Sequence, residues 1–186
     1  MAGKKKKNTF SYIITALVLS AVITLCLNPI IRLVYPLEYA GIIEENAKIR
    51  KLDAFLVMGI ISAESGFDKN AQSHKDAKGL MQLTEDTASW CMENLQVEVP
   101  EGDLANPGTN IAIGCAYLEY LIDRYDGNIE TASAAYNAGP GNVDKWLGDK
   151  RYSDGKKTLT NIPFSETKDY VEKVIKRTEI YRKLYK

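Results

Sequence analysis

The chain has 186 residues, which is enough for one domain with an appended segment and for a substantial buried core. Its formal net charge is zero, but all 24 acidic residues follow Pro36, where 19 basic residues leave a net charge of −5. A domain of this charge lacks the basic surface that nucleic-acid binding requires, so no nucleic-acid partner is expected.

The N-terminal segment predicts a basic cytoplasmic tail over residues 1–9 and a transmembrane anchor over residues 10–31. Four lysines, Lys4–Lys7, precede the uncharged stretch Asn8–Ile31, which is long enough to cross a membrane because a span needs roughly 20 residues. Flanking lysines stay on the cytoplasmic side, which sends the rest of the chain outward. A cleaved signal peptide is the alternative, but Leu25–Pro29 offers no small-x-small site. An uncleaved anchor is favoured, and cleavage stays open.

The cysteines and the single histidine give no metal site. No CxxC pair is present and His74 is the only histidine, so a zinc site lacks ligands. Cys91 and Cys115 fall on apolar faces of predicted helices. A disulfide between them is allowed outside the cytoplasm, but buried free thiols are favoured because cysteine packs as a small hydrophobe.

The first part of the domain predicts three helices. Leu37–Arg50 has apolar residues among solvated charges. Asp53 can cap the next helix, Ala54–Ile61, which is apolar nearly all round and is therefore expected at the centre of the fold. Thr84 supplies a capping hydroxyl before a third helix that includes Ala88–Leu95.

The second part predicts three more. Apolar residues follow the helical period over Asn110–Tyr125. Asn128 can begin the next helix, Ile129–Asn137, and Gly139–Gly141 is expected to stop it. A last helix is expected over Glu166–Tyr185. No stretch alternates convincingly at period two, so the fold class is mainly α, with at most a short hairpin.

Glu64 stands where the apolar central helix meets a polar loop containing Asn70–Gly79, the place for that hairpin. A carboxyl group at the mouth of an apolar element loses hydration, which favours its neutral form and raises its pKa. A proton donor to an ether-type oxygen needs that property at neutral pH. Taken alone, however, a solvated helix end is the commoner explanation of such a glutamate.

Several separated blocks of sequence favour the catalytic explanation of Glu64 over a solvated helix end. Their order and spacing resemble the catalytic domain of the soluble lytic murein transglycosylases, a lysozyme-like family that cuts peptidoglycan glycan strands and is related to goose-type lysozymes. The blocks are Glu64-Ser65-Gly66-Phe67, Ser73, Gly79-Leu80-Met81-Gln82, Ala134–Val143 and Ile162–Thr167 followed by Tyr170-Val171. Separated blocks are more specific than any single short motif. The resemblance implies a lysozyme-like catalytic domain over residues 37–186.

The resemblance also implies a reaction and a site. The bond cut joins N-acetylmuramic acid to N-acetylglucosamine, and the muramyl C6 hydroxyl attacks the anomeric carbon, leaving a 1,6-anhydro end without water. Glu64 matches the catalytic residue, acting first as acid and then as base, and no metal or cofactor is needed. Six residues match positions of the glycan-binding cleft: Ser73, Gln82, Tyr136, Asn137, Glu166 and Tyr170.

Some of these residues have simpler explanations. Ser73 can bond its own loop backbone, Glu166 suits the first turn of a helix, and Tyr170 can be a core aromatic. Asp76 replaces a glycine that the family usually has before the Gly-Leu-Met-Gln block, which leaves the local loop conformation open, although Ala77 keeps its expected place.

Two other functions stay open. A hydrolytic muramidase of the goose-type kind needs a second carboxylate to activate water, and the loop offers Asp68 or Asp76. A wall-binding scaffold with weak catalysis, within a larger cell-wall or secretion machinery, is the other alternative. Both keep the expected location of the domain, outside the cytoplasm and facing the cell wall of a bacterium.

Overall fold

The computed structural model describes residues 2–97, 99 and 103–186, and it describes no side chain of residues 2–9, 21 and 23–28. The predicted basic tail therefore lies outside the described side chains. The chain divides at Leu37 into two units. The first contains α1 (Ala2–Val34), with Pro29 inside the helix. Within the described part of the chain, no helix has both the length and the hydropathy of a membrane span, so the anchor predicted over residues 10–31 gains no support here.

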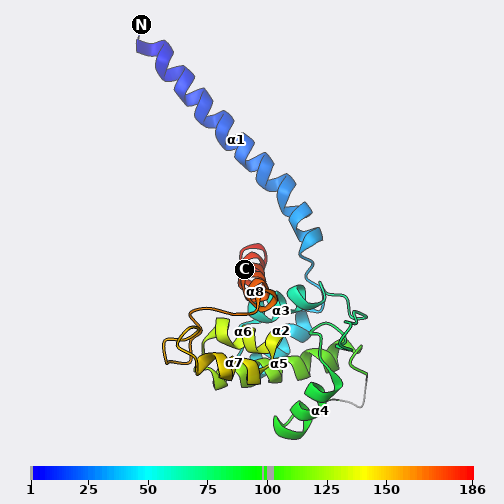
Figure 1. Cartoon of the computed structure of the whole chain (residues 1–186). Coiled ribbons are helices and arrows are strands. Elements are labelled where there is room, and N and C mark those ends of the chain that lie inside the picture. The colour runs from blue at the N-terminus through cyan, green and yellow to red at the C-terminus, as the bar shows by residue number, and fades with distance from the viewer. Residues whose placement is uncertain (1, 98, 100–102) are drawn as a thin grey trace. The chain divides into compact units, whose positions relative to one another are not determined.

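The second unit is helical, as predicted from the sequence (Figure 1). Outside helices, the described residues form only isolated bridges, of which Gln72 with Lys78 falls in the segment predicted to allow a hairpin. The helices of this unit are α2 (Ala40–Ile49), α3 (Ala54–Glu64), α4 (Glu85–Asn94), α5 (Pro107–Arg124), α6 (Ile129–Ala138), α7 (Pro140–Leu147) and α8 (Ser165–Tyr185).

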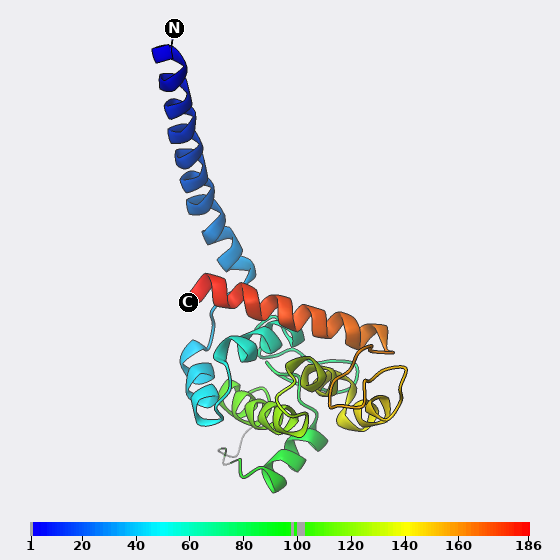
Figure 2. The same ribbon diagram turned by 90° about the vertical axis from the view of Figure 1, so that its left-hand side faces the viewer.

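The core forms around α3, in agreement with its uninterrupted apolar sequence. Every residue from Leu56 to Ala63 is buried, because α3 has neighbours on all sides and exposes no polar face. Its main partner is α8, which lies along it (Figure 2). The two helices approach closely at Gly59, where a Cβ atom would come within 3.0 Å of the Thr178 backbone nitrogen. Any larger residue at this position would force the helices apart.

The three side chains that were predicted to cap the first turns of helices, Asp53, Thr84 and Asn128, form these caps. The Asp53 carboxylate accepts a hydrogen bond from the Phe55 amide at 3.0 Å at the start of α3. Thr84 Oγ1 accepts from the Thr87 amide at the start of α4, and Asn128 accepts from the Thr131 amide at the start of α6. Each cap satisfies an amide that has no partner within its helix.

Gly139–Gly141 ends α6, as predicted from the sequence, but helix α7, which begins at Pro140, was not predicted. Gly139 has a φ of 84° and turns the chain between α6 and α7. Pro140 is then the first residue of α7, a position where the missing amide hydrogen has no consequence and the fixed φ suits a helix. Val143 and Trp146 are the buried residues of α7.

Candidate active site

Glu64 is the last residue of α3, and the turn that follows aims the chain away from the helix axis. Ser65 Oγ donates a hydrogen bond to the Leu80 carbonyl at 2.8 Å, which ties the helix end to the returning loop. Gly66 and Phe67 both have positive φ, and Phe67 is buried. Helix α3 therefore ends with the side-chain carboxyl group of Glu64 beside the loop instead of in open solvent.

The returning loop is held from below by Asn110 of α5, which is fully buried. Its side-chain oxygen accepts from the Met81 amide at 2.7 Å, and its side-chain nitrogen donates to the carbonyls of Lys78 (3.0 Å) and Leu104 (2.8 Å). Gly79 lies against this amide with a φ of 75°, so a Cβ atom at that position would overlap Asn110. One side chain thus fixes the backbone of the Gly-Leu-Met-Gln block.

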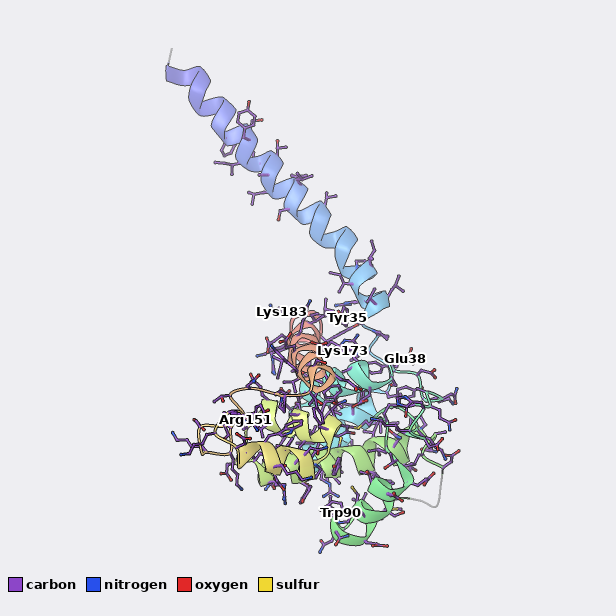
Figure 3. The ribbon with its side chains drawn as sticks, in the orientation of Figure 1. Tyr35, Glu38, Trp90, Arg151, Lys173 and Lys183 are labelled. Carbon is purple, nitrogen blue, oxygen red and sulfur yellow. The ribbon has the colours of Figure 1, made fainter. Side chains whose placement is uncertain are left out.

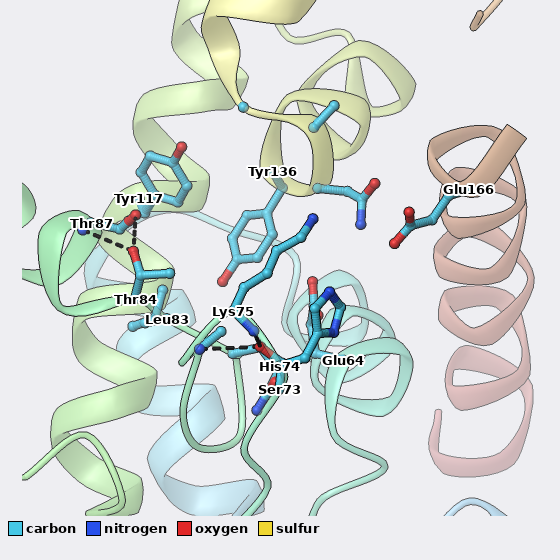
Figure 4. A pocket seen from close by; sticks show the side chains of 15 residues that line it. Glu64, Ser73, His74, Lys75, Leu83, Thr84, Thr87, Tyr117, Tyr136 and Glu166 are labelled. Carbon is cyan, nitrogen blue, oxygen red and sulfur yellow. Dashed lines mark hydrogen bonds between the residues drawn. The ribbon is translucent and has the colours of Figure 1, made fainter. Parts of the chain in front are cut away.

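A cleft of about 340 Å³ opens over Glu64. In Figure 4, Glu166 projects from α8 on one side and Thr84, Thr87 and Tyr117 lie on the other, with Glu64 and Tyr136 between them. The cleft is lined by six of the residues that were singled out from the sequence: Glu64, Ser73, Gln82, Tyr136, Asn137 and Glu166.

The carboxyl group of Glu64 is held in its neutral form up to neutral pH. Burial raises its pKa from 4.5 to about 7, and the nearby Tyr170 hydroxyl and the Lys173 charge oppose part of that rise. A group with this pKa is protonated often enough to donate and basic enough, once ionised, to take a proton back.

Two phenols lie close to Glu64. Tyr136 donates to the Met81 carbonyl at 2.9 Å. The Tyr170 hydroxyl is buried, makes no hydrogen bond of standard length and angle with a described residue, and lowers the pKa of the nearby Glu64. Burial, followed by the charge of Glu64, raises the pKa of both phenols well above 10, so both stay neutral donors. Tyr170 was predicted to wall the cleft, but its side chain is buried next to Glu64 and is not part of the cleft lining.

Two cations of α8 bind the last carbonyl groups of α3. Lys173 Nζ donates to the Ala63 carbonyl at 2.6 Å. The Arg177 guanidinium donates to the Ser62 carbonyl and, at 2.8 Å, to Ser62 Oγ. Carbonyls in the last turn of a helix lack partners and carry negative partial charge, so cations stabilise them. Desolvation and Arg177 lower the pKa of Lys173, whereas Glu64 raises it.

Ser73 and Gln82 line the cleft and also hold their own loop. Ser73 Oγ accepts from the amides of Lys75 (3.2 Å) and Ala77 (3.1 Å), the loop-bonding role that was the simpler explanation of this residue. Gln82 has a φ of 48° and donates through Nε2 to the carbonyls of Ala71 and Gly79. The Gln82 side-chain oxygen and the Ser73 hydroxyl proton stay available to a ligand.

Asn137 and Glu166 form the wall between α6 and α8. Asn137 Oδ1 accepts from Thr167 Oγ1 at 2.8 Å, which leaves its amide nitrogen free to donate to a ligand. Glu166 is exposed in the first turn of α8 and also lines the cleft. Both explanations of this residue, a first-turn acid and a cleft residue, therefore agree with the structure. No other carboxyl group of the described residues lines the cleft together with Glu64.

Several cleft residues were not singled out from the sequence. His74 and Lys75 reach the cleft from the loop, and Thr87 and Tyr117 reach it from α4 and α5 (Figure 4). For His74 and Lys75, the only feature of the sequence that pointed to the cleft was their position next to Ser73. Tyr117 lies one helical turn before Tyr120. That spacing predicts that the two tyrosines share a face of the helix, but it does not predict that this face borders a cleft.

The carboxylates considered as a second catalytic group lie elsewhere. Asp68 is exposed and accepts from the Asn70 amide at 2.9 Å, as expected of a turn residue. Asp76 is exposed and accepts from Gln72 Nε2 at 3.2 Å, in a positive-φ conformation (57°) that a glycine would adopt more easily. Neither lines the cleft. In the described part of the chain, no group of three His, Cys, Asp or Glu residues is placed to hold a metal ion.

With this geometry in view, comparison with known proteins is decisive for the family. The family model described as "Transglycosylase SLT domain" matches residues 41–159. The chain belongs to this family. A soluble lytic murein transglycosylase of Salmonella typhimurium is 35% identical over 153 residues, which cover 80% of this chain and 23% of the relative. The chain therefore spans about a quarter of the length of such curated relatives.

Solved structures of the family confirm the fold. A chain of the lytic transglycosylase Slt from Pseudomonas aeruginosa, solved as an inactive glutamate-to-glutamine mutant, is 35% identical with a TM-score of 0.72, covering 80% of this chain and 24% of that one. The 70 kDa soluble lytic transglycosylase from Escherichia coli is 34% identical with a TM-score of 0.73, covering 80% and 25%. The mainly helical, lysozyme-like fold predicted from the sequence is confirmed.

Proposed function

We propose that the domain over residues 37–186 is a peptidoglycan lytic transglycosylase, which cleaves the β-1,4 bond between N-acetylmuramic acid and N-acetylglucosamine and leaves a 1,6-anhydromuramyl end. The observation that carries this proposal is the environment of Glu64, a carboxyl group with a pKa of about 7 in the floor of an open cleft. The inactivity of the P. aeruginosa relative that carries glutamine in place of one glutamate supports a single glutamate as the centre of the reaction.

In the first step, the protonated Glu64 donates its proton to the glycosidic oxygen, and the bond from that oxygen to the anomeric carbon breaks. The leaving sugar keeps the proton and departs with a free hydroxyl group. Glu64 is then a carboxylate beside a positively charged sugar, close to the Tyr136 and Tyr170 phenols and to the Lys173 ammonium. The Tyr170 hydroxyl and the Lys173 charge lower the pKa of Glu64, so these two groups stabilise the carboxylate for the time it has no proton.

In the second step, the muramyl C6 hydroxyl attacks the anomeric carbon and transfers its proton to Glu64, which restores the starting form of the enzyme. The attacking oxygen is part of the substrate, so its effective concentration at the reacting carbon is high and no second carboxylate is needed to activate water. Asp68 and Asp76, the loop carboxylates considered for water activation, lie outside the cleft, so Glu166 on the opposite wall is the other carboxylate that a hydrolytic muramidase could use among the described residues of the lining.

The other cleft residues serve to hold the glycan. The Gln82 oxygen, the Asn137 amide nitrogen and the Ser73 hydroxyl offer neutral hydrogen-bonding groups for sugar hydroxyl and acetamido groups. Glu166, on the opposite wall, offers an acceptor for sugar hydroxyls. Tyr170 acts on the substrate only through Glu64, because its side chain is buried.

The N-terminal segment is proposed to anchor the domain to a bacterial membrane by a single span over residues 10–31, with the basic tail inside the cell and the domain facing the cell wall. The sequence supports this through Lys4–Lys7 and the uncharged stretch after them. Apolar side chains of α1 with described positions, such as Phe10, Leu17 and Leu19, are exposed, as suits a helix surrounded by lipid.

The test of the proposed function is the chemistry of the products. The full chain is incubated with purified sacculi, and the released fragments are analysed by mass spectrometry. We expect 1,6-anhydromuramyl ends, which are lighter than reducing ends by one water. Reducing ends would show a muramidase instead. Binding to sacculi without soluble fragments would show a wall-binding scaffold.

The charge of Lys173 predicts a pH effect. Because the reaction starts from protonated Glu64, the cleavage rate is expected to fall as pH rises through about 7. Lys173→Met removes a positive charge that lowers the pKa of Glu64, so that fall is expected at higher pH in the variant. Rates of fragment release from sacculi between pH 5 and 9 check this. Lys176→Met, an exposed lysine of the same helix, is the control, and an identical shift in both variants would contradict a local effect.

A further inference from the structure

The two walls of the cleft over Glu64 carry opposite charges. Glu166 lies on the wall formed by α8, whereas His74 and Lys75 reach the cleft from the loop (Figure 4). Lys75 is the one lysine or arginine among the described residues that line the cleft. Sugar hydroxyl and acetamido groups are served by neutral donors and acceptors. Binding of neutral sugars therefore leaves the Lys75 charge unexplained.

The backbone that carries Lys75 is fixed before a ligand binds. The Ser73 amide donates to the Ala77 carbonyl at 2.9 Å, and the Asp76 amide donates to the Ser73 carbonyl at 3.1 Å. The Lys75 amide donates to Ser73 Oγ at 3.2 Å. Ala77 is buried and anchors the turn to the domain. His74 and Lys75 are thus held at the tip of a closed turn, and their side chains project toward the cleft (Figure 4).

The ammonium group of Lys75 is not neutralised by the acids around it. The adjacent Asp76 carboxylate accepts a hydrogen bond from Gln72 Nε2 at 3.2 Å. Glu85, which lines a neighbouring hollow together with Lys75, is paired with Lys78 at 2.9 Å. Among the residues whose side chains the structure describes, Lys75 forms no ion pair. Its positive charge therefore stays available to an anionic group of a ligand.

The proposed substrate has one group that can be charged close to the bond that is cut. N-acetylmuramic acid carries a lactyl ether at C3, which ends in a carboxylate when no stem peptide is attached. When a stem peptide is attached, that carboxylate is replaced by a neutral amide. The other substituents of the two sugars are neutral hydroxyl and acetamido groups. In this cleft a carboxylate is attracted by Lys75 and repelled by Glu166, so its favourable place is at the loop wall.

We infer that Lys75 binds the lactyl carboxylate of an N-acetylmuramic acid that carries no stem peptide, and that the domain therefore prefers peptide-free glycan. The inference rests on the proposed function, because the reaction places the muramyl residue over Glu64. The lysine ammonium offers three donors and a positive charge, and a hydrogen bond between charged groups is stronger than one between neutral groups. A peptide-bearing muramyl residue presents a neutral amide at this place and gains nothing from the charge.

The test compares three forms of one glycan in the full chain carrying Glu64→Gln, which is expected to bind without cutting. The glycan is a short oligomer of alternating N-acetylglucosamine and N-acetylmuramic acid. Its lactyl groups are free acids, neutral methylamides or amides to stem peptides. Binding is followed by calorimetry at low and at physiological ionic strength. We expect the free acid to bind about three- to fivefold more tightly than the methylamide at low salt, the size of a solvent-exposed ion pair, and this ratio to shrink as salt rises.

Variants at position 75 assign this preference to one side chain. Lys75→Met keeps a long side chain without its charge, so the free acid should bind no more tightly than the methylamide. Lys75→Arg keeps the charge and should keep the preference. Lys183→Met removes the same charge near the far end of α8 from Glu166 (Figure 3) and should leave the preference unchanged. The affinity for the methylamide should stay the same in all three variants, which shows that the cleft is intact.

Three results would overturn the inference. The first is equal affinity for the free acid and the methylamide when Lys75 is present. The second is a preference for the free acid that survives Lys75→Met or does not respond to salt. The third is tightest binding of the peptide-bearing form, lost in Lys75→Met, which would assign Lys75 to a carboxylate of the stem peptide.

Failure of this inference is distinct from failure of the proposed function. If only the assignment of Lys75 is wrong, the chain with Glu64 intact still produces 1,6-anhydromuramyl ends from sacculi, while the free acid and the methylamide are not distinguished through Lys75. If the proposed function is wrong, those ends are missing whatever residue stands at position 75.

Discussion

Glu64→Gln is expected to reduce the release of fragments from sacculi by at least about 10³-fold, because general acid–base catalysis typically contributes 10²–10⁴-fold and here one group performs both transfers. Glutamine keeps the size and polarity of the side chain but can neither donate a proton to the glycosidic oxygen nor accept one from the C6 hydroxyl. Quantification of muropeptides after digestion, with enzyme in excess, measures the loss.

The fold of this variant should survive. Folded Glu64 keeps its proton up to a pH of about 7, whereas an unfolded chain loses it near 4.5, so the folded state binds more protons between these values and loses stability as pH rises through them. Glutamine has no such proton, so at pH 8 the variant is expected to be at least as stable as the unchanged chain. Urea denaturation at pH 4 and pH 8 checks this.

Asp68→Asn is the matched control for the loss of a carboxylate. Its carboxylate is exposed and serves a turn, so cleavage should stay within a few fold of the unchanged chain. If Asp68→Asn were as inactive as Glu64→Gln, water activation by a second carboxylate would replace the mechanism proposed here. If Glu64→Gln were inactive and also less stable at pH 8, its role would be structural.

The helices were predictable where local chemistry decides them. Asp53, Thr84 and Asn128 cap helices because their side chains reach amides two or three residues ahead, an interaction that the sequence itself contains. Helix α7 was missed because a proline after a glycine ends one helix and can equally begin another. Which of the two occurs depends on whether residues such as Trp146 find a place in the core, and that is decided by the whole fold.

The candidate site was predictable only in its outline. Glu64 could be found because an acid ends an apolar helix, and the resemblance supplied the residues around it. Lys173 and Arg177 could not be found, because their positions on α8 look like an ordinary solvated face, and only the packing of α8 along α3 brings them to the carbonyls of Ala63 and Ser62. For Tyr170 the sequence left a cleft wall and a core aromatic as alternatives, and its side chain is buried; periodicity gives a face of a helix and no distance from the surface.

These contacts explain how an apolar helix can end beneath a cleft that is open to water. The last carbonyls of α3 are satisfied by α8 through Lys173 and Arg177, and Ser65 satisfies the Leu80 carbonyl of the loop. The backbone at this helix end is thereby fixed by hydrogen bonds to α8 and to the loop. The Glu64 carboxyl can then be dehydrated by its surroundings and still face a substrate.

Asn110→Ala is expected to destabilise the fold by about 3–5 kcal/mol, a large part of the total stability of a typical domain. The change removes three hydrogen bonds. The Lys78 carbonyl keeps its bond from the Leu83 amide, whereas the Met81 amide and the Leu104 carbonyl lose this partner, and an unsatisfied buried group typically costs about 1–3 kcal/mol. The midpoint of urea unfolding, followed by circular dichroism, should fall with little change in slope. Asn94→Ala, an exposed asparagine on α4, is the control and should change stability by less than about 0.5 kcal/mol.

The same substitution should also weaken catalysis in the molecules that stay folded. Met81 is held through its amide by Asn110, and its carbonyl accepts the hydrogen bond that orients Tyr136 beside Glu64. Releasing the Met81 backbone therefore frees a phenol of the cleft lining beside Glu64, and cleavage measured at a temperature well below unfolding should drop about tenfold or more because the site loses its fixed geometry. Unchanged cleavage in a destabilised Asn110→Ala chain would show that Asn110 contributes to stability but not to catalysis, and that Ser65, Ser73 and Gln82 keep the loop in its conformation without it.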